Sequence, residues 1–451
     1  MQGKGKILFA AAAAIVLALA SIAEADEKGA ANSASLPGQP LTMHAAVVYG
    51  LEHNPLIFAA EEQIQAAAQS VNQAEAKFYP KLDTGYSFTE LDDQPYQTFN
   101  GQDIPSSHTE LNRWEVTLTQ PLFTGFSLSG NLAAAKIGKD IASYDRDGVR
   151  MDCIRDIQHA FLQVLLSNRL LEVARDHIKA LEVQRKNAVS QFGQGLTPRN
   201  DVLKADVALA EATQNERAAV KDLHLAKSRL NRLLNIDYSV DLTLEESDWE
   251  NTPPPNTLTL EQLFLKAQEQ RPELRSAKAA IDAAQQRMRV AKSGYFPQIS
   301  AVGGYYREGE DFLADKNDYT NSYNASIGLK LRWNLFEGGE THAAAKEWVY
   351  RRNALERQEE DLVNRVYLQI QDAYEQVGVA KANIETSRTA LAQALENERI
   401  TTVQYREQMV VFSEVLDAQV YVMQSRADYY KALYGHRMAW ADLQRAIGAS
   451  F

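Results

Sequence analysis

The sequence has little cysteine, proline or glycine, and it has no long apolar run after its first residues. The one cysteine, Cys153, cannot form an intrachain disulfide. No cysteine stands at the N-terminal cleavage site predicted below, where a bacterial lipid anchor would be attached. We interpret Cys153 as a small packed side chain. The 13 prolines and 23 glycines lie mainly at the boundaries of long patterned stretches, which favours long helices. No later segment approaches about 18 uninterrupted apolar residues, so no transmembrane helix is predicted in the mature chain.

Signals for enzymatic chemistry are also missing. No H-E-x-x-H, G-x-S-x-G, Walker or Rossmann pattern occurs, and the eight histidines lack ligand spacing. His44 and His53 do not share a helix face cleanly, so we interpret them as solvated helix positions. The net charge of -12 argues against a nucleic-acid partner. The sequence therefore predicts no enzyme, no cofactor, no metal site and no nucleic-acid binding.

The first residues have the pattern of a secretory signal. Lys4 and Lys6 precede an apolar run over residues 7–20, and Ala23-Glu24-Ala25 follows as a cleavage site. An N-terminal membrane anchor is the alternative, but the run is shorter than the roughly 20 residues that a span requires. We predict a signal peptide over 1–25 and a disordered leader over 26–40.

The rest of the chain is one long unit repeated twice. Leu41-Thr42 and Phe78-Tyr79-Pro80 return 217 positions later as Leu258-Thr259 and Tyr295-Phe296-Pro297. Further along, the offset between equivalent positions is 213, as for Phe192 and Tyr405. We therefore predict repeat 1 over 41–236 and repeat 2 over 258–448, joined by an irregular acidic linker over 237–257 outside the main body.

Each repeat opens with a helix and continues with a β-hairpin. In repeat 1 we predict one helix from the capping Thr42 to about Lys77, where Pro80 stops it. Apolar and polar residues then alternate, which indicates hairpins at about 81–123 and 298–336, each with a long polar connection. In the return strand of repeat 2, the apolar face carries these residues: Tyr323, Ala325, Ile327, Leu329, Leu331 and Trp333.

A very long helix is predicted after each hairpin, over about 126–192 and 340–405. Each is then broken once, at 193–198 and at 405–412, and a partner helix returns to about Asn235 or Ile447. Repeat 2 shows five heptads of apolar and small residues, which predict a left-handed supercoil; an ordinary amphipathic helix is the alternative. The heptad positions are Val363, Val366, Ile370, Ala373, Val377, Ala380, Ile384, Ser387, Leu391 and Ala394.

Four amphipathic strands per chain are too few to close a membrane barrel, because such barrels begin at eight strands. Either the strands form a small soluble sheet, or several chains combine their strands in one barrel. The signal peptide, the apolar faces and the long loops favour the second interpretation.

Residues 41–448 resemble the TolC family of outer-membrane efflux ducts. The resemblance is carried by the duplicated N-P or R-P and F/Y-P motifs, the L-F-x-G turns and the paired helix breaks. It implies a mainly α fold with a membrane β part, in which an antiparallel coiled-coil helical barrel continues a 12-stranded β-barrel. It also implies a homotrimer with four strands from each chain, a periplasmic adaptor (membrane fusion) protein and an inner-membrane pump of RND or ABC type as partners. The chain would have no chemistry of its own and would lie in outer-membrane lipid with a periplasmic tunnel.

The resemblance places a gate near the two helix breaks. The matching positions are Asp201, Tyr405, Glu414 and Asp417, and the three carboxylates among them would form an acidic ring that attracts cations. Alternatively, Asp201 and Glu414 only stabilise the helix starts after the breaks. Where some family members have an arginine of the closing network this chain has Val410, and Arg406 or Arg199 are the candidates to replace that arginine.

Five aromatic residues of the hairpins are predicted to face lipid, with the core of a soluble sheet as the alternative. They are Tyr86, Phe88, Trp114, Tyr323 and Trp333.

The leading functional hypothesis is a passive outer-membrane exit duct that exports small toxic compounds for a tripartite pump. The outer-membrane component of type I protein secretion is the alternative, and a non-channel periplasmic coiled-coil scaffold is a third hypothesis.

Overall fold

The computed structural model describes residues 40–246 and 258–449, and these form a mainly helical fold with a small sheet. The predicted signal peptide and nearly all of the leader lie outside the described residues, as does the second half of the linker. The helices are α2 Met43–His53, α3 Pro55–Ala76, α4 Ser127–Gly193, α5 Arg199–Leu234, α6 Leu260–Gln270, α7 Pro272–Ala291, α8 Glu340–Arg406 and α9 Phe412–Ala446, with a 3₁₀ turn η1 at Lys292–Tyr295. The strands are β1 Lys81–Glu90, β2 Tyr96–Phe99, β3 Gln102–Pro105, β4 Glu110–Phe123, β5 Gln298–Gly309 and β6 Tyr323–Arg332.

The opening helix of each repeat is two helices, so the prediction of one helix from Thr42 to Lys77 was wrong. Thr42 caps α2 as expected, but α2 ends at His53 and α3 begins at Pro55. Proline cannot donate the backbone hydrogen bond that would continue α2. Asn54 stabilises the break, because its side chain accepts from the Leu56 N–H and donates to the Leu233 carbonyl oxygen.

The four-stranded sheet has the order β1-β4-β5-β6, and all its neighbouring strands are antiparallel. The register aligns the apolar residues of all four strands on one face, as the pairs Leu82–Leu118, Val116–Tyr305 and Gly303–Ile327 show. The region predicted as a polar loop in the first hairpin contains a second small hairpin, β2–β3. Its turn is Asn100-Gly101, with φ angles of 50° and 80° that suit a tight hairpin turn.

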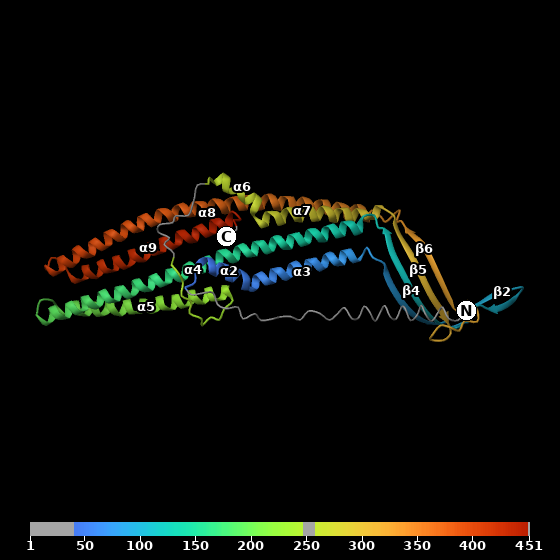
Figure 1. The fold of residues 1–451 in the computed structure, drawn as a ribbon, viewed down its shortest axis with the longest axis horizontal. Coiled ribbons are helices and arrows are strands. Elements are labelled where there is room, and N and C mark those ends of the chain that lie inside the picture. The colour runs from blue at the N-terminus through green and yellow to red at the C-terminus, as the bar shows by residue number, and fades with distance from the viewer. Residues whose placement is uncertain (1–39, 247–257, 450–451) are drawn as a thin grey trace. The chain divides into compact units, whose positions relative to one another are not determined.

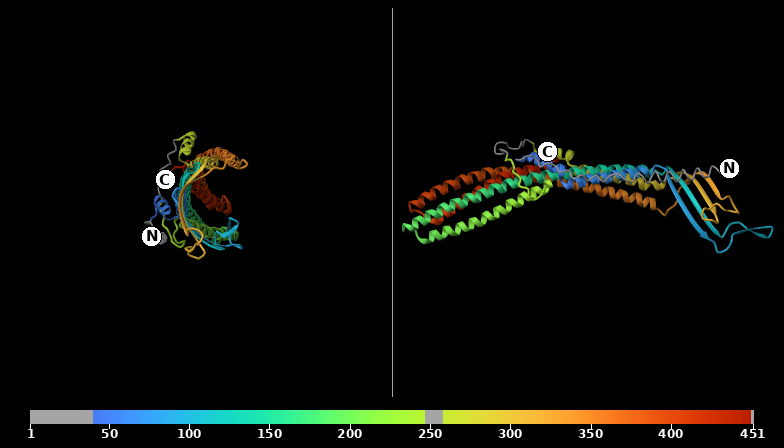
Figure 2. Two further views of the ribbon diagram at one scale, coloured as in Figure 1. Left: turned by 90° about the vertical axis from the view of Figure 1, so that its right-hand side faces the viewer. Right: turned by 60° about the horizontal axis from the view of Figure 1, so that its bottom comes forward.

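The two 67-residue helices, α4 and α8, determine where everything else lies. At 1.5 Å per residue each extends for about 100 Å. Because β4 leads into α4 and β6 leads into α8, the sheet lies at their N-terminal ends and the helix breaks lie at the opposite ends (Figure 1). Helices α3 and α7 pack beside the sheet-proximal halves, whereas α5 and α9 pack beside the halves that lead to the breaks (Figure 2).

The predicted heptads form the packed stripe of α8. Val366 and Ile370 are almost fully buried, Val377, Ala380 and Ala394 are buried, and the other heptad residues are partly buried. Much of this stripe packs in a cluster that draws residues from α6, α7 and α9 as well. Because most of the remaining surface of α8 is exposed, a single narrow stripe holds this long helix in place.

The first half of the linker packs against the body of the protein, so its predicted position outside the body was wrong. Leu41 pairs with Leu244 in a parallel bridge, and Leu242 is buried in the core of the first repeat. Asn231 donates its side-chain amide to the backbone oxygens of Asp237 and Val240. The segment is irregular, as predicted, yet side chains and backbone tie it to α2 and α5.

Cys153 is a free cysteine and is buried in α4, as the sequence suggested. Burial raises the pKa of its thiol to about 11, with smaller contributions from Asp156 and Asp152. Because the pKa is raised, the thiol stays protonated until the pH approaches 11. We expect alkylation of the folded protein at pH 8 to be about 100-fold slower than for an exposed cysteine, because only the thiolate reacts. Mass spectrometry of native and urea-unfolded samples measures this, and equal rates would contradict it.

Candidate functional site

The backbone makes the same turn at the two helix breaks. At the first, Gly195 has φ 72°, and at the equivalent position of the second, Gln408 has φ 58°. The backbone N–H groups that follow donate back into the ends of α4 and α8, from Leu196 to Gln191 and from Met409 to Gln404. The second break therefore keeps the turn geometry of the first without its glycine.

An apolar cluster joins the two breaks. Ala188 at the end of α4 and Ala205 in α5 pack with buried residues of the second break. These are Tyr405, Phe412 and Val415. Val410 packs against the same cluster. We call this set the tip cluster, and it holds the ends of the two helix hairpins together within one chain.

Tyr405 is the largest polar side chain of the tip cluster. It is 9 % exposed, its ring lies 5.4 Å from that of Phe412, and its hydroxyl donates to Gln191 Oε1 at 3.2 Å. Burial raises the pKa of Tyr405, and the neighbouring Asp201 carboxylate raises it further. The hydroxyl therefore remains a neutral donor that links the end of α8 to the first break.

The four predicted gate residues are not all in one cluster. Asp201 and Tyr405 interact, as described above. Glu414 and Asp417 are exposed, and neither forms an ion pair among the residues that the structure describes. Asp201 and Glu414 both occupy the first turn of the helix after their break, where a carboxylate complements the helix dipole.

The arginine candidates for the closing network are not engaged in this chain. Arg199 and Arg406 are exposed and form no ion pair within the described part of the protein. Val410 contributes apolar packing at the position where an arginine was considered. Packing and the tyrosine links therefore hold the tip within one chain.

Sequence reasoning missed Gln191, the acceptor for Tyr405. Gln191 directly precedes Phe192, which is the repeat equivalent of Tyr405. An amide next to the repeat equivalent of Tyr405 is a usable signal, but it becomes specific only when the fold brings α4 and α8 together.

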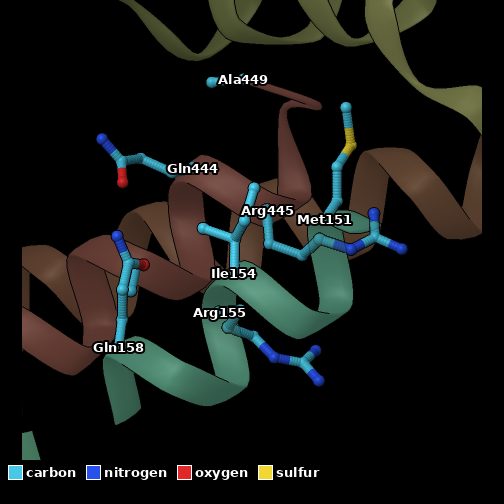
Figure 3. Close-up of a pocket in the computed structure, with 8 residues that line it drawn as sticks. Met151, Ile154, Arg155, Gln158, Gln444, Arg445 and Ala449 are labelled. Carbon is cyan, nitrogen blue, oxygen red and sulfur yellow. The ribbon is translucent and has the colours of Figure 1, made fainter. Parts of the chain in front are cut away.

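A charged cluster joins three helices at the other end of α9. Arg445 has a side chain only 12 % exposed, and it pairs with Asp152 of α4 at 2.7 Å and with Glu273 of α7 at 2.5 Å. Figure 3 shows Arg445 extending beside Met151 and Ile154 of α4, which line a small cavity with it. Burial alone would raise the pKa of Glu273, but hydrogen bonding and the charge of Arg445 lower it on balance.

Replacing Arg445 by glutamine should therefore destabilise the fold by about 3 kcal/mol. This value is at the lower end of the range for breaking a buried ion pair, because both carboxylates are partly exposed. The lowered pKa of Glu273 means that its stabilising contribution is present above the usual carboxyl pKa and is lost as the pH falls through the folded-state pKa. The wild type should thus lose stability in acid more steeply than Arg445→Gln. Thermal unfolding at pH 7 and pH 4 measures both effects.

The matched control is Arg399→Gln, which breaks an exposed pair with Glu396 on α8. Such surface pairs contribute about 0–1 kcal/mol. Equal losses for the two variants would show that the Arg445 cluster has no special role.

The aligned apolar face of the sheet is exposed. Ile327 is 91 % exposed and Leu329 is 75 % exposed, and their neighbours across the sheet are also accessible. Of the five predicted lipid-facing aromatics, Tyr86, Phe88 and Tyr323 are exposed on strands, and Trp333 is exposed just after β6. Trp114 is half-buried, because Phe312 and Tyr86 pack against it and its indole N–H donates to the Phe312 carbonyl oxygen.

Two features are absent from the described residues. None of the helices there has an apolar stretch of the length needed to cross a membrane. In the same residues, no group of three or more histidine, cysteine or acidic side chains is arranged to hold a metal ion.

Comparison with known proteins found one family and several relatives. The sequence model described as "Outer membrane efflux protein" matches residues 49–235 and again residues 263–449. The alkaline protease secretion protein AprF of Pseudomonas aeruginosa is 24 % identical over 405 residues, which cover 88 % of this chain and 82 % of AprF. The outer membrane protein TolC of Vibrio cholerae is 22 % identical over 401 residues, 88 % of each protein. The crystal structure of CusC superposes with a TM-score of 0.78 at 16 % identity, covering 90 % of this chain and 92 % of CusC.

Proposed function

Because the two matches to the family model span most of the chain, the protein belongs to the outer membrane efflux protein family, and we propose that it is the exit duct of a tripartite efflux pump. The family comprises channels. In this proposal the chain lies in the outer membrane of a Gram-negative bacterium, with its helices in the periplasm. Small toxic compounds or drugs would pass through it without chemical change, driven by a pump elsewhere.

The observation that carries the proposal is the exposed apolar face of an unclosed sheet. The two edge strands, β1 and β6, have no partner outside the sheet among the described residues. In a bilayer such edges would leave backbone groups unsatisfied, so only closure into a barrel is stable there. Three copies supply twelve strands, which is enough for a membrane barrel. We therefore propose a homotrimer with the apolar face toward lipid.

The second part of the proposal is a gate at the helix breaks. In a trimer, three copies of Asp201, Glu414 and Asp417 surround the axis at the periplasmic end and attract cations. Tyr405 and the tip cluster link the two hairpins of each chain, so loosening them would widen the entrance. The exposure of Glu414 and Asp417 leaves these carboxylates accessible to permeating ions or to an adaptor.

The proposed partners follow from the function. A passive duct in the outer membrane needs an energy source in the inner membrane, which we propose is a pump of the RND or ABC type. A periplasmic adaptor would connect the two. The exposed breaks at the end of the helices are the part of the chain that such an adaptor would meet first.

Type I protein secretion is the second candidate function, and the similarity to AprF supports it, because that relative is a protease secretion protein. A duct of this kind conducts whatever its pump delivers.

Deletion of the gene separates the two functions. For an efflux duct, the deletion strain should become several-fold more sensitive to small toxic compounds, while its secreted proteins stay the same. For a secretion duct, one or more proteins should disappear from the medium with sensitivity unchanged. No change in either measurement, with the protein present in the wild-type outer membrane, would contradict the transport proposal.

A further inference from the structure

The two hairpins of the sheet pair in the same register although they belong to different repeats. Lys81 pairs with Thr119 in the first hairpin, and Gln298 pairs with Arg332 in the second. These pairs are related by the repeat offsets, 217 for the outgoing strand and 213 for the returning strand. Strand β5 is therefore the equivalent of β1, and β6 is the equivalent of β4.

The pairing between the two hairpins within one chain therefore serves as a template for the pairing between two copies. Strand β4 pairs with β5, and in that contact Thr119 lies opposite Val302 while Thr117 lies opposite Gly304. In a closed barrel, β6 of one copy meets β1 of the next. Replacing each residue by its repeat equivalent places Arg332 opposite Gly85 of the partner subunit and Lys330 opposite Ser87 of the partner subunit.

This register is consistent with the faces of the sheet. It sets Leu331 opposite Tyr86 of the partner subunit and Leu329 opposite Phe88 of the partner subunit, so apolar residues meet apolar residues. A slip of one residue would turn one strand's apolar side to the polar face. The repeat and the face pattern thus select the same pairing.

The edge strands also carry charges at positions where the equivalent residues of the inner strands are uncharged. On the polar face, β6 has Lys330 and Arg332 where β4 has two threonines, and β1 has Asp83 where β5 has Ser300. Within the described chain, Arg332 forms no ion pair and Asp83 pairs only with Lys81, at 2.6 Å. The Asp83 side chain remains 50 % exposed. Near the helices, the polar face of the outer edges therefore presents Asp83, whose partner within the described chain is Lys81, on β1 and the cations Lys330 and Arg332 on β6.

We propose that β6 and β1 of neighbouring copies pair in this register, forming a contact that we call the seam, and that Arg332 binds Asp83 of the partner subunit across it. This proposal rests on the trimer proposed above. Asp83 lies two residues from Gly85, so the pair is diagonal across the strands. Diagonal neighbours have Cα atoms about 7–8 Å apart, which a long arginine side chain spans. The ion pair fixes the register at the helix-proximal end of the seam, where three identical seams must form together.

Disulfide cross-linking tests the register. Ser87→Cys combined with Lys330→Cys places two cysteines directly opposite each other, with Cα atoms about 4.5–5.5 Å apart, within the range of a disulfide. Mild oxidation should convert most of the protein to cross-linked species on a denaturing gel. The control combines Ser87→Cys with Ser326→Cys, four residues further along β6 and about 13 Å away. The buried Cys153 provides the background in the unmodified chain.

Preferential cross-linking of the Ser326 control, or no cross-linking by either pair in an intact trimer, would overturn the register. A wild-type protein that runs as a monomer in native mass spectrometry would instead overturn the proposed trimer, so the two failures are distinct.

A double-mutant cycle tests the ion pair. Arg332→Thr and Asp83→Ser each install the residue that the other repeat has at the equivalent position. Each single variant should lower the temperature at which the trimer dissociates in detergent. The double variant should lower this temperature no more than the more damaging single variant does, because both substitutions remove the same interaction. Lys330→Thr, which faces Ser87 of the partner subunit, is the control and should leave the temperature nearly unchanged. Losses of Arg332→Thr and Asp83→Ser that add in the double variant would overturn the pair.

Discussion

Cells that produce the Tyr405→Ala variant should become permeable to large hydrophilic antibiotics that the wild-type protein excludes. Tyr405 is a buried member of the tip cluster and links the end of α8 to Gln191 and Asp201. Removing a buried aromatic side chain costs about 3–5 kcal/mol. The tip cluster is small, so this loss should separate the two hairpins and widen the entrance. We expect sensitivity to rise several-fold, measured as the inhibitory concentration.

Two control variants separate the effect of the ring from that of the hydroxyl, and the effect of a buried tyrosine from that of an exposed one. Tyr405→Phe keeps the ring and removes only the hydroxyl, so it should give a smaller increase. Tyr421→Ala removes a tyrosine of α9 that is 58 % exposed, and it should behave as wild type. Unchanged sensitivity in Tyr405→Ala, at equal amounts of trimer in the membrane, would show that the tip cluster does not hold the entrance closed.

The second large effect is expected on the apolar face of the sheet. Ile327 lies in the middle of β6 and is 91 % exposed. If this face contacts lipid, Ile327→Lys places a charge in the hydrocarbon region, which costs about 2–4 kcal/mol per copy near the midplane. Three copies carry the substitution, so the amount of protein assembled in the outer membrane should fall to a small fraction of the wild-type amount. Membrane fractionation with quantitative blotting measures this.

The adjacent residue provides the matched control, because successive residues of a strand point to opposite faces. Ser326→Lys places the same charge on the polar face, where water is expected, and assembly should be nearly normal. Equal assembly of the two variants would contradict a lipid-facing apolar surface.

Much of the helical architecture follows from the sequence because long periodic patterns specify it. The heptads of α8 predicted its packed stripe, and the helix breaks fall where the patterns stop. The break before Pro55 was missed because the surrounding residues all favour helix, although proline itself gave the signal. The β2–β3 hairpin was missed in the same way, since its Asn100-Gly101 turn lies in a segment that is otherwise polar.

Features that depend on contacts between distant parts of the chain could not be predicted from the sequence. Gln191 is an ordinary helical glutamine until the fold brings Tyr405 beside it. The packing of residues 237–246 depends on Leu41 and Asn231, which lie far away in the sequence or in another element. Glu414 and Asp417 are exposed in one chain, and their proposed role depends on the other copies around the axis.

The central claim is that this chain forms a water-filled pore across a membrane, and single-channel recording from purified protein in a planar bilayer tests it most directly. The account predicts discrete, uniform conductance steps that favour cations, with a selectivity that weakens when Asp201 and Glu414 are both changed to alanine. Protein that stays in solution without detergent and gives no conductance steps would contradict the account and favour a periplasmic scaffold.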